Sequence, residues 1–138
     1  MNIKKCFELA KYSSKNSDCK IKVGCVLVYK NKVLAISYNT TKTHPLQKIY
    51  NVYRSTNGRL FDVDKMNNGI HAEMSILINT RHLNIDYNKC KLFVYSETKN
   101  GNTRLSKPCN ACYKALKDNG IKYIYYTNDN NGYNYERI

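Results

Sequence analysis

Two short motifs, widely separated along the chain, constrain its fold more than any other feature. The first is His71-Ala72-Glu73 and the second is Pro108-Cys109-Asn110-Ala111-Cys112. Together they offer one imidazole and two thiols, which are ligands that Zn²⁺ prefers in proteins. A chain that places these three groups on one metal must fold so that the two motifs meet. Three protein ligands leave one tetrahedral position open for water, which is typical of a catalytic rather than a structural zinc site.

The spacing within each motif suits this role. Cys109 and Cys112 lie at positions i and i+3, so they share one face of the first turn of a helix. Pro108 suits a helix start because it lacks an N–H group that would go unpaired there. The positive end of a helix lowers the pKa of a thiol and favours the metal-binding thiolate. His71 lies at a second expected helix start, so we expect two helix N-termini to converge on one metal.

Glu73 supplies the group that catalysis needs beside such a metal. It follows His71 closely, so its carboxylate can approach a metal-bound water without replacing that water. Zn²⁺ lowers the pKa of bound water toward about 7 in favourable sites, and a nearby carboxylate can then transfer protons. Taken alone, the two cysteines also suit a redox pair or half of a zinc knuckle, and His71 also suits a packed or surface histidine. The joint pattern favours a catalytic zinc site.

Hydrophobic periodicity predicts alternating helices and strands. Helical spacing of apolar residues predicts helices over 2–16, 71–81 and 110–118. Runs rich in β-branched and aromatic residues predict strands over 21–29, 33–39, 90–95 and 121–127. Lys30-Asn31-Lys32 predicts a turn that joins the first two strands as an antiparallel hairpin. Asn131-Gly132 favours a second hairpin, which ends in a short strand over 133–138.

This order of elements predicts an α/β fold with three α/β/α layers. Helices would cover a mixed sheet of four to five strands that ends in a C-terminal antiparallel hairpin. The 138 residues are enough for one core but not for two, so we expect a single domain over 1–138. Residues 40–69 show no sustained period, and a loop of this length is usually functional or mobile. We expect a short helical turn within it, at 50–54.

The composition indicates the class of partner. Lys and Arg number 23 against 10 Asp and Glu, which gives a net charge of +13. A bias toward AT-rich codons accounts for much Lys and Asn but not for the scarcity of acidic residues, so polyanions are the natural partners. The alternative is a well-solvated basic surface.

No apolar run reaches the length of a signal peptide or a membrane span, and the six cysteines show no disulfide framework spacing. We therefore expect a cytoplasmic, intracellular protein with reduced thiols and no membrane partner.

The motifs together form the pattern H-x-E…P-C-x-x-C, and through it the chain resembles the cytidine/deoxycytidylate deaminase superfamily. The resemblance extends from the first helix through Tyr126, in the family's order of elements. It implies zinc as the cofactor. The matching residues are the zinc ligands His71, Cys109 and Cys112 and the proton shuttle Glu73. The resemblance also implies that Asn39, at the end of the second strand, hydrogen-bonds the substrate sugar, although an asparagine there equally suits a simple turn.

Departures from the family pattern bear on the substrate. Deaminases of free cytidine usually have Cys where this chain has His71, so that branch is less favoured. Deoxycytidylate and transfer-RNA adenosine deaminases commonly have Glu-Pro before the first cysteine, whereas this chain has Lys107-Pro108. The loop that precedes this pair is also longer and more basic than in those branches. A C-terminal hairpin is similar to the free-nucleoside deaminases and to toxin-type deaminases that act on nucleic acid.

Three functional hypotheses follow. The first is a zinc-dependent hydrolytic deaminase that converts cytosine to uracil in single-stranded nucleic acid, with DNA favoured. The second is a deaminase of free cytidine or deoxycytidine nucleotides. The third is a non-catalytic, zinc-stabilised module that binds nucleic acid, against which Glu73 argues because a structural site needs no proton shuttle. The motif leaves open the choice of cytosine over adenine and the oligomeric state.

Substrate contacts are expected from residues around the predicted site. The substrate-binding candidates are Asn39, His44, Ala72, Ser106, Lys107 and Pro108. The candidates for contact with nucleic acid are Lys42, Arg54, Arg59, Lys99, Arg104 and Tyr113. The cations among them can contact phosphates, and Tyr113, like Tyr50 and Tyr53, can stack on bases, although a tyrosine more often lies in a core. His44 and His82 are also alternative metal ligands, and we interpret His82 as a cap or surface residue.

Overall fold

The computed structural model describes residues 2–54 and 69–138, and Arg59 lies outside the described residues. Its main sheet has five strands in the order β2-β1-β5-β6-β7. These strands are β1 (Val23–Tyr29), β2 (Lys32–Tyr38), β5 (Cys90–Ser96), β6 (Tyr123–Thr127) and β7 (Tyr133–Arg137). Strands β5 and β6 pair in parallel, and the other neighbours are antiparallel. The sheet is therefore mixed, as the sequence predicted.

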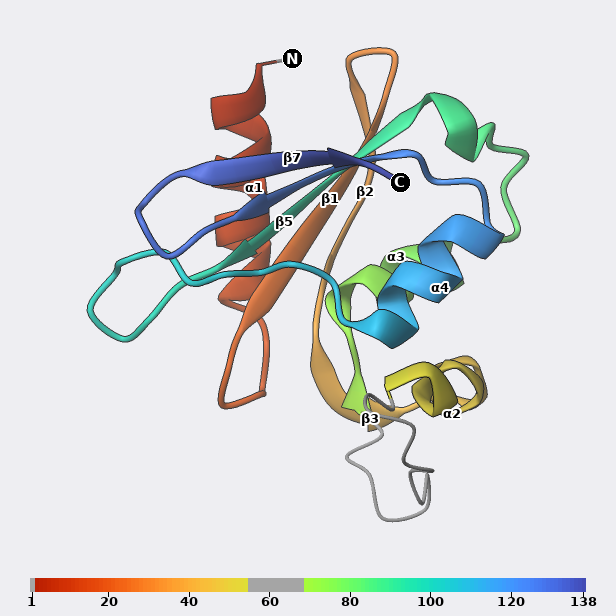
Figure 1. The fold of residues 1–138 in the computed structure, drawn as a ribbon, viewed down its shortest axis with the longest axis horizontal. Coiled ribbons are helices and arrows are strands. Elements are labelled where there is room, and N and C mark those ends of the chain that lie inside the picture. Colours follow the sequence, from red (N-terminus) through yellow and green to blue (C-terminus); the bar gives the residue numbers. More distant parts are fainter. Residues whose placement is uncertain (1, 55–68) are drawn as a thin grey trace.

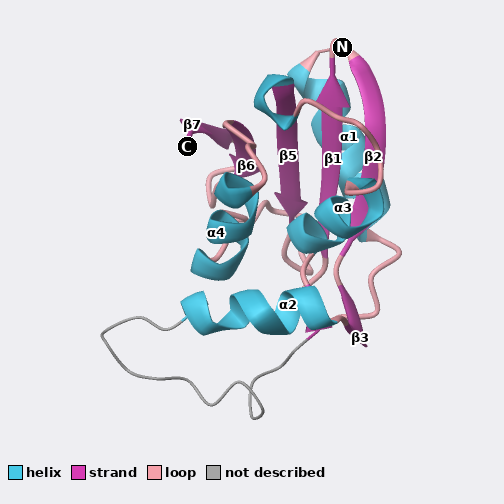
Figure 2. Ribbon diagram, turned by 90° about the vertical axis from the view of Figure 1, so that its right-hand side faces the viewer, coloured by secondary structure: helices cyan, strands magenta, loops and turns pink. Residues whose placement is uncertain are grey.

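Helices cover both faces of this sheet (Figure 1). Helix α1 (Ile3–Ser14) packs on one face against β1, β2 and β5. Helices α3 (Ala72–Thr80) and α4 (Asn110–Asp118) lie on the other face, and Figure 2 shows α1 and α3 on opposite sides of the strands. The core has two parts. In one, Ala10 of α1 packs in a cluster with Phe93 of the sheet, and in the other, Met74 of α3 packs in a cluster with Leu92 of the sheet. The three-layer α/β/α prediction is confirmed.

The parallel pair of strands places α4 relative to the sheet. Parallel neighbours need a crossover connection, which is usually a helix, and α4 is the helix between β5 and β6. The start of α4 consequently lies beyond the carboxyl end of β5, the edge at which open α/β sheets commonly bind ligands. Cys109 directly precedes α4. The topology therefore brings this cysteine to a ligand-binding edge.

Both predicted hairpins are present. Lys30 and Asn31 have φ angles of 49° and 64°, so both residues adopt the left-handed region that a tight two-residue turn requires. This turn joins β1 to β2 in antiparallel register. Strand β7 pairs antiparallel with β6, and Asn131 in the connecting turn has a φ of 60°. The C-terminal antiparallel hairpin is confirmed.

The prediction of a loop over 40–69 is wrong for the described part of that segment, although the short helical turn predicted at 50–54 is present. It contains β3 (Thr40–Thr43), α2 (Pro45–Tyr50), the 3-10 turn η1 (Asn51–Arg54) and β4 (Gly69–Ile70). Strands β3 and β4 form a separate two-stranded antiparallel sheet. Strand β3 escapes detection because its sequence, TTKT, has no hydrophobic alternation, and α2 is too short to show a helical period. A second 3-10 turn, η2 (Tyr87–Lys89), precedes β5.

None of the helices within 2–54 and 69–138 combines the length and the apolar character needed to cross a membrane.

Gly24 in β1 sets the distance between α1 and the sheet. A Cβ atom at this position would lie 1.9 Å from the carbonyl oxygen of Ala10 and 2.7 Å from the backbone nitrogen of Ser14. Both neighbours are backbone atoms of α1, so they cannot move aside as a flexible side chain can. Helix α1 therefore lies directly on the backbone of β1 at this point.

We expect Gly24→Ala to lower the free energy of unfolding by about 1–3 kcal/mol or more, because overpacking forces backbone shifts. Urea denaturation followed by circular dichroism measures this change. The matched control is Gly132→Ala, whose added Cβ would lie 3.5 Å from its nearest neighbour, an ordinary contact distance. Equal unfolding midpoints for the two variants would contradict the proposed close packing.

Candidate active site

Two helix N-termini bring the three predicted metal ligands together. His71 is the N-cap residue of α3 and Cys109 is the N-cap residue of α4, and neither side chain caps its own helix. The Nδ1 atom of His71 lies 3.5 Å from the Sγ atom of Cys109 and 3.3 Å from the Sγ atom of Cys112. The three ligand atoms all lie within 4.8 Å of one another.

These distances fit a zinc ion. A tetrahedral centre with Zn–S bonds of about 2.3 Å and Zn–N bonds of about 2.0–2.1 Å holds its sulfur and nitrogen ligands roughly 3.6 Å apart. The observed Nδ1 to Sγ distances lie close to this separation. The donor set of one imidazole and two thiols also matches a three-ligand zinc centre with an open fourth position. His71, Cys109 and Cys112 therefore have both the geometry and the chemistry to hold Zn²⁺.

The ligands influence one another's protonation in the absence of metal. A hydrogen bond from Cys112, together with the nearby His71, lowers the pKa of the Cys109 thiol to about 4. The same hydrogen bond, reinforced by burial, raises the pKa of Cys112 well above its ordinary value. Burial would lower the pKa of His71, but the hydrogen bond to Cys109 and the charge of Glu73 outweigh it and raise this pKa. The metal-free pair thus consists of one thiolate and one thiol.

Glu73 lies in the first turn of α3 with only 5% of its surface exposed. Burial raises the pKa of its carboxyl group, although the positive charge of His71 opposes this rise. A carboxyl group whose pKa moves toward neutrality can both accept and return a proton at the pH of the cell. The burial of Glu73 therefore suits the predicted proton shuttle.

Buried polar side chains that the sequence analysis missed hold the first motif in place. The side-chain oxygen of Gln47, which is fully buried, accepts a hydrogen bond of 3.0 Å from the backbone N–H of His71. The amide nitrogen of Gln47 in turn donates to Asn51 at 2.8 Å. Gln47 and Asn51 lie at i and i+4, the spacing of neighbours on a helix surface. That spacing would have signalled their pairing only if α2 had been predicted as a helix.

Two serines fix the next residue of the motif. The hydroxyl of Ser37 on β2 donates to the carbonyl oxygen of Ala72 at 2.7 Å, and the hydroxyl of Ser13 on α1 donates to the carbonyl oxygen of Ser37 at 2.7 Å. All three residues are buried. This chain of hydrogen bonds runs through the sheet and connects α1 to the start of α3.

A cleft of about 320 Å³ opens beside the metal ligands. Four of the predicted substrate-binding residues line it, namely Asn39, Ala72, Ser106 and Lys107. Glu73 and Arg104 also line it. A neighbouring cleft of about 260 Å³ shares Asn39 and His71 with the first and is lined by Arg54. The clefts therefore meet at the imidazole ligand.

Two of these lining side chains already have structural partners. The side-chain oxygen of Asn39 accepts a hydrogen bond of 2.9 Å from the backbone N–H of Val23, and its amide nitrogen donates to the carbonyl oxygen of Ile21 at 2.7 Å. The hydroxyl of Ser106 donates to the carbonyl oxygen of Val94 and accepts from the backbone N–H of Thr127, both at 2.9 Å. These bonds hold the walls of the cleft, and a substrate contact by either side chain stays a prediction.

Arg104 and Lys107 both line the cleft of about 320 Å³, but their side chains differ in the partners that they contact. The Nε atom of Arg104 is buried and has no hydrogen-bond partner within residues 2–54 and 69–138. The Nζ atom of Lys107 lies 3.5 Å from a carboxylate oxygen of Glu136 and 5.6 Å from the ring centroid of Tyr113. The hydroxyl of Tyr113 donates to Glu136 as well. This hydrogen bond ties Tyr113 of α4 to β7, and Tyr113 does not line either cleft.

Several predicted contacts do not reach the clefts. His44 instead caps α2, where its Nδ1 atom accepts a hydrogen bond of 3.0 Å from the backbone N–H of Leu46. Lys99 lies in a turn closed by a hydrogen bond from the backbone of Thr98 to that of Asn102, and the loop is anchored on the β6–β7 turn instead of the metal ligands. The exposed Lys42 and the buried Pro108 do not line the clefts either. His82, interpreted from the sequence as a cap or surface residue, is exposed.

Comparisons with known proteins agree with this geometry. A family model described as the cytidine and deoxycytidylate deaminase zinc-binding region matches residues 2–128. A comparison with curated protein sequences gave no match. Among solved structures, the chain is similar to a cytidine deaminase from Burkholderia pseudomallei, with a TM-score of 0.67 and 17% identity over 99% of this chain and 93% of that chain.

The fold is also similar to that of a dCMP deaminase from the cyanophage S-TIM5. Its apo form aligns with a TM-score of 0.62 and 22% identity over 93% of this chain and 86% of that chain. Its complex with dCMP and dUMP aligns with a TM-score of 0.60 and 21% identity over 93% of this chain and 84% of that chain. At these identities the likeness establishes the fold.

Zinc binding should release protons from the site. Because the raised pKa of Cys112 keeps its thiol protonated at neutral pH, zinc must displace at least this proton. We expect the affinity for zinc to rise about tenfold per pH unit for each proton released. Isothermal titration calorimetry in two buffers of different ionisation enthalpy counts these protons. Cys19→Ser changes a thiol that is not among the three clustered ligands and should leave the count unchanged. A pH-independent affinity would contradict the assignment.

Proposed function

The chain belongs to the cytidine and deoxycytidylate deaminase family, and from this premise we propose that it deaminates free cytosine nucleotides in their monophosphate form. The reaction replaces the exocyclic amine of cytosine with oxygen from one water molecule and releases one ammonia. The observation that carries the proposal is the position of Glu73. Buried Glu73 lines the cleft of about 320 Å³ together with two of the three candidate zinc ligands, His71 and Cys109.

His71, Cys109 and Cys112 would hold the zinc ion. Zinc bound there supplies a Lewis acid that lowers the pKa of water toward neutrality. Glu73 performs the proton transfers. Its carboxylate accepts a proton from the attacking water, and the resulting carboxylic acid returns that proton to the ring nitrogen of the pyrimidine. A later transfer by the same group helps the amine leave as ammonia.

Hydrogen bonds to the backbone of the first motif fix the position of Glu73 relative to the metal ligands. Gln47 fixes the N–H group of His71, and Ser37 fixes the carbonyl group of Ala72. Glu73 follows directly, so its starting position in α3 is set by two buried hydrogen bonds. Such positioning lowers the entropy cost of bringing an acid–base group to its substrate.

The size and charge of the cleft support a mononucleotide. A volume of about 320 Å³ lies near the lower end of the range of roughly 300–1,000 Å³ that small-molecule sites occupy. Arg104 lines this cleft with a buried Nε atom that lacks a partner in the described part of the chain, and a phosphate oxygen would satisfy it. Lys107 lines the same cleft and adds a second positive charge.

Single-stranded nucleic acid, the first hypothesis from the sequence, has less support at this cleft. Lys42, Lys99 and Tyr113, which were expected to bind the strand, do not line the cleft. The similar structures are of a cytidine deaminase and a dCMP deaminase, and one of the latter contains dCMP and dUMP. These observations favour the second hypothesis, a free nucleotide.

Glu73→Gln should lower kcat for dCMP by about 10²- to 10⁴-fold, because the amide cannot accept or return the proton. Zinc content should stay at one ion per chain, since Glu73 is not among the three clustered ligands. Ammonia release and elemental analysis measure the two quantities. Glu8→Gln, on the exposed surface of α1, is the matched control. Wild-type turnover by Glu73→Gln would refute the proposed proton shuttle.

Arg104→Gln should raise KM for dCMP about tenfold or more, since hydrogen bonds to charged groups contribute about 1.5–3 kcal/mol. The KM for deoxycytidine, which lacks the phosphate, should barely change. Lys99→Gln removes a cation outside the cleft and serves as the control. A cytosine-containing single-stranded oligonucleotide, assayed beside dCMP, tests the substrate class. Faster conversion of the oligonucleotide than of dCMP would overturn the proposal.

A further inference from the structure

The face of the sheet opposite the metal ligands is only partly covered. Helix α1 packs there over β1, β2 and β5, and the ring of Phe7 lies 5.3 Å from that of Tyr133 on β7. Beyond this contact, Tyr133 and Tyr135 remain 46% and 49% exposed. Alternate residues of a strand point to the same face, so both rings border one surface. Adjacent aromatic rings that stay half exposed are a common mark of an interaction site.

A row of aromatic rings extends across three strands of this face. The strand register places Phe93 beside Tyr125 and Tyr125 beside Tyr135. The ring centroids of Phe93 and Tyr125 are 4.6 Å apart in a stacked arrangement, and those of Tyr125 and Tyr135 are 4.8 Å apart. We call Phe93, Tyr125, Tyr133 and Tyr135 the aromatic row. It begins in the core and ends at rings that another flat ring can reach.

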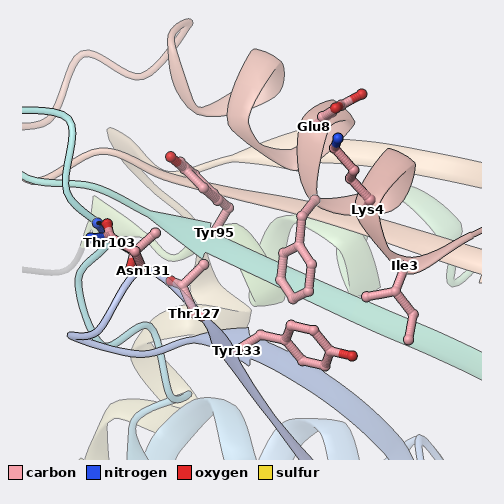
Figure 3. Close-up of a pocket in the computed structure, with 10 residues that line it drawn as sticks. Ile3, Lys4, Glu8, Tyr95, Thr103, Thr127, Asn131 and Tyr133 are labelled. Carbon is pink, nitrogen blue, oxygen red and sulfur yellow. Dashed lines mark hydrogen bonds between the residues drawn. The ribbon is translucent and has the colours of Figure 1, made fainter.

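An apolar cavity of about 440 Å³ adjoins the aromatic row (Figure 3). Its walls include Ile3 and Phe7 from α1 and Tyr133 from β7, and Thr103 and Asn131 form a polar edge. The volume falls within the range of sites that hold small flat ligands. None of the three candidate zinc ligands lines this cavity. It is therefore a separate site on the far side of the sheet.

Cations surround the aromatic row and the cavity. A cleft of about 210 Å³ shares Ile3 with the cavity and is lined by Phe93 of the row. Its lining lysines are Lys30, Lys89 and Lys91. Lys4 lies at the rim of the cavity (Figure 3). The guanidinium group of Arg137 lies 6.0 Å from the ring centroid of Tyr123, so positive charge also borders the outer strands.

Charge complementarity selects the occupant of this surface. Four lysines line the cavity and the cleft against one acid, Glu8. Two further acids lie beside lining residues: Asp86 is 3.9 Å from Lys89, and Glu97 accepts a hydrogen bond from Tyr95. A second copy of the chain seated face to face here would bring the same lysines, Lys30, Lys89 and Lys91, against these ones, so like charges would meet. Aromatic rings bordered by cations are the arrangement that binds single-stranded nucleic acid, because bases stack on the rings while phosphates contact the cations.

We propose that the aromatic row and its surrounding lysines bind single-stranded nucleic acid at a site separate from the deaminase cleft. Bases stack on Tyr133 and Tyr135, and backbone phosphates contact Lys4 and Lys91. The sheet separates this strand from Glu73, so binding and deamination are distinct functions. Binding of a polyanion would explain the net charge of +13, which a cleft for a mononucleotide does not require.

Fluorescence anisotropy of the zinc-loaded protein with a labelled oligothymidine of about 15 nucleotides tests the proposal. Oligothymidine contains no cytosine, so deamination cannot alter the probe. Tyr135→Ala should weaken binding about tenfold or more, because each stacked base depends on its ring. Tyr135→Phe keeps the ring and should bind like the wild type. Tyr12→Ala, which removes a 68% exposed tyrosine of α1 outside the row, is the matched control.

A second variant tests the electrostatic part. Lys91→Gln removes one exposed cation and should lower the slope of log K against log[salt] by about 0.7, the value for one phosphate contact on a single strand. If Tyr135→Ala lowers the melting temperature, the salt dependence of binding by Lys91→Gln still tests the proposal. Deamination of dCMP should be unchanged in both variants, so the result does not depend on the proposed substrate.

Three outcomes would overturn the proposal. The first is that the wild type fails to bind the oligonucleotide. The second is that Tyr135→Ala binds it as tightly as Tyr12→Ala does. In the third, sedimentation shows that Tyr135→Ala dissociates a dimer without weakening oligonucleotide binding, which would make this face a contact between two copies of the chain.

Discussion

The meeting of two helix N-termini at one set of metal ligands is the constraint on which the rest of the structure depends. His71 precedes α3 and Cys109 precedes α4, and their ligand atoms come within 3.5 Å of each other. Both helix ends carry partial positive charge, which favours the thiolate form of the ligands. Because the helices must start at the same point, the sheet beneath them has to present the ends of β2 and β5 on one side.

The two faces of the sheet have different tasks in this account. On one face, Ser37 and Gln47 hold the first motif, and Glu73 lines the cleft beside His71 and Cys109. On the other face, α1 is pressed against β1 at Gly24 and covers only part of the sheet. The uncovered part carries the aromatic row. A basic protein can thereby separate the chemistry of a small substrate from the binding of a polyanion.

Sequence patterns predicted the parts of the fold that hydrophobic burial determines. Strand β1, apolar on both faces, and the turn at Lys30 and Asn31 were found, as were the helices that carry the ligands. Elements held by polar contacts were missed, including β3 and α2 with its buried Gln47. Lys99 was expected near the site because sequence cannot reveal that its loop is hydrogen-bonded to the β6–β7 turn. The reaction was thus predicted better than the substrate contacts.

X-ray absorption at the zinc edge of the zinc-loaded protein tests the central claim most directly. The account predicts four ligands, with two sulfurs at about 2.3 Å and a nitrogen and an oxygen at about 2.0–2.2 Å. The oxygen would come from water at the open position. A shell of three or four sulfurs would contradict it, because a further thiol, such as that of the buried Cys25, would then close the position that the reaction requires.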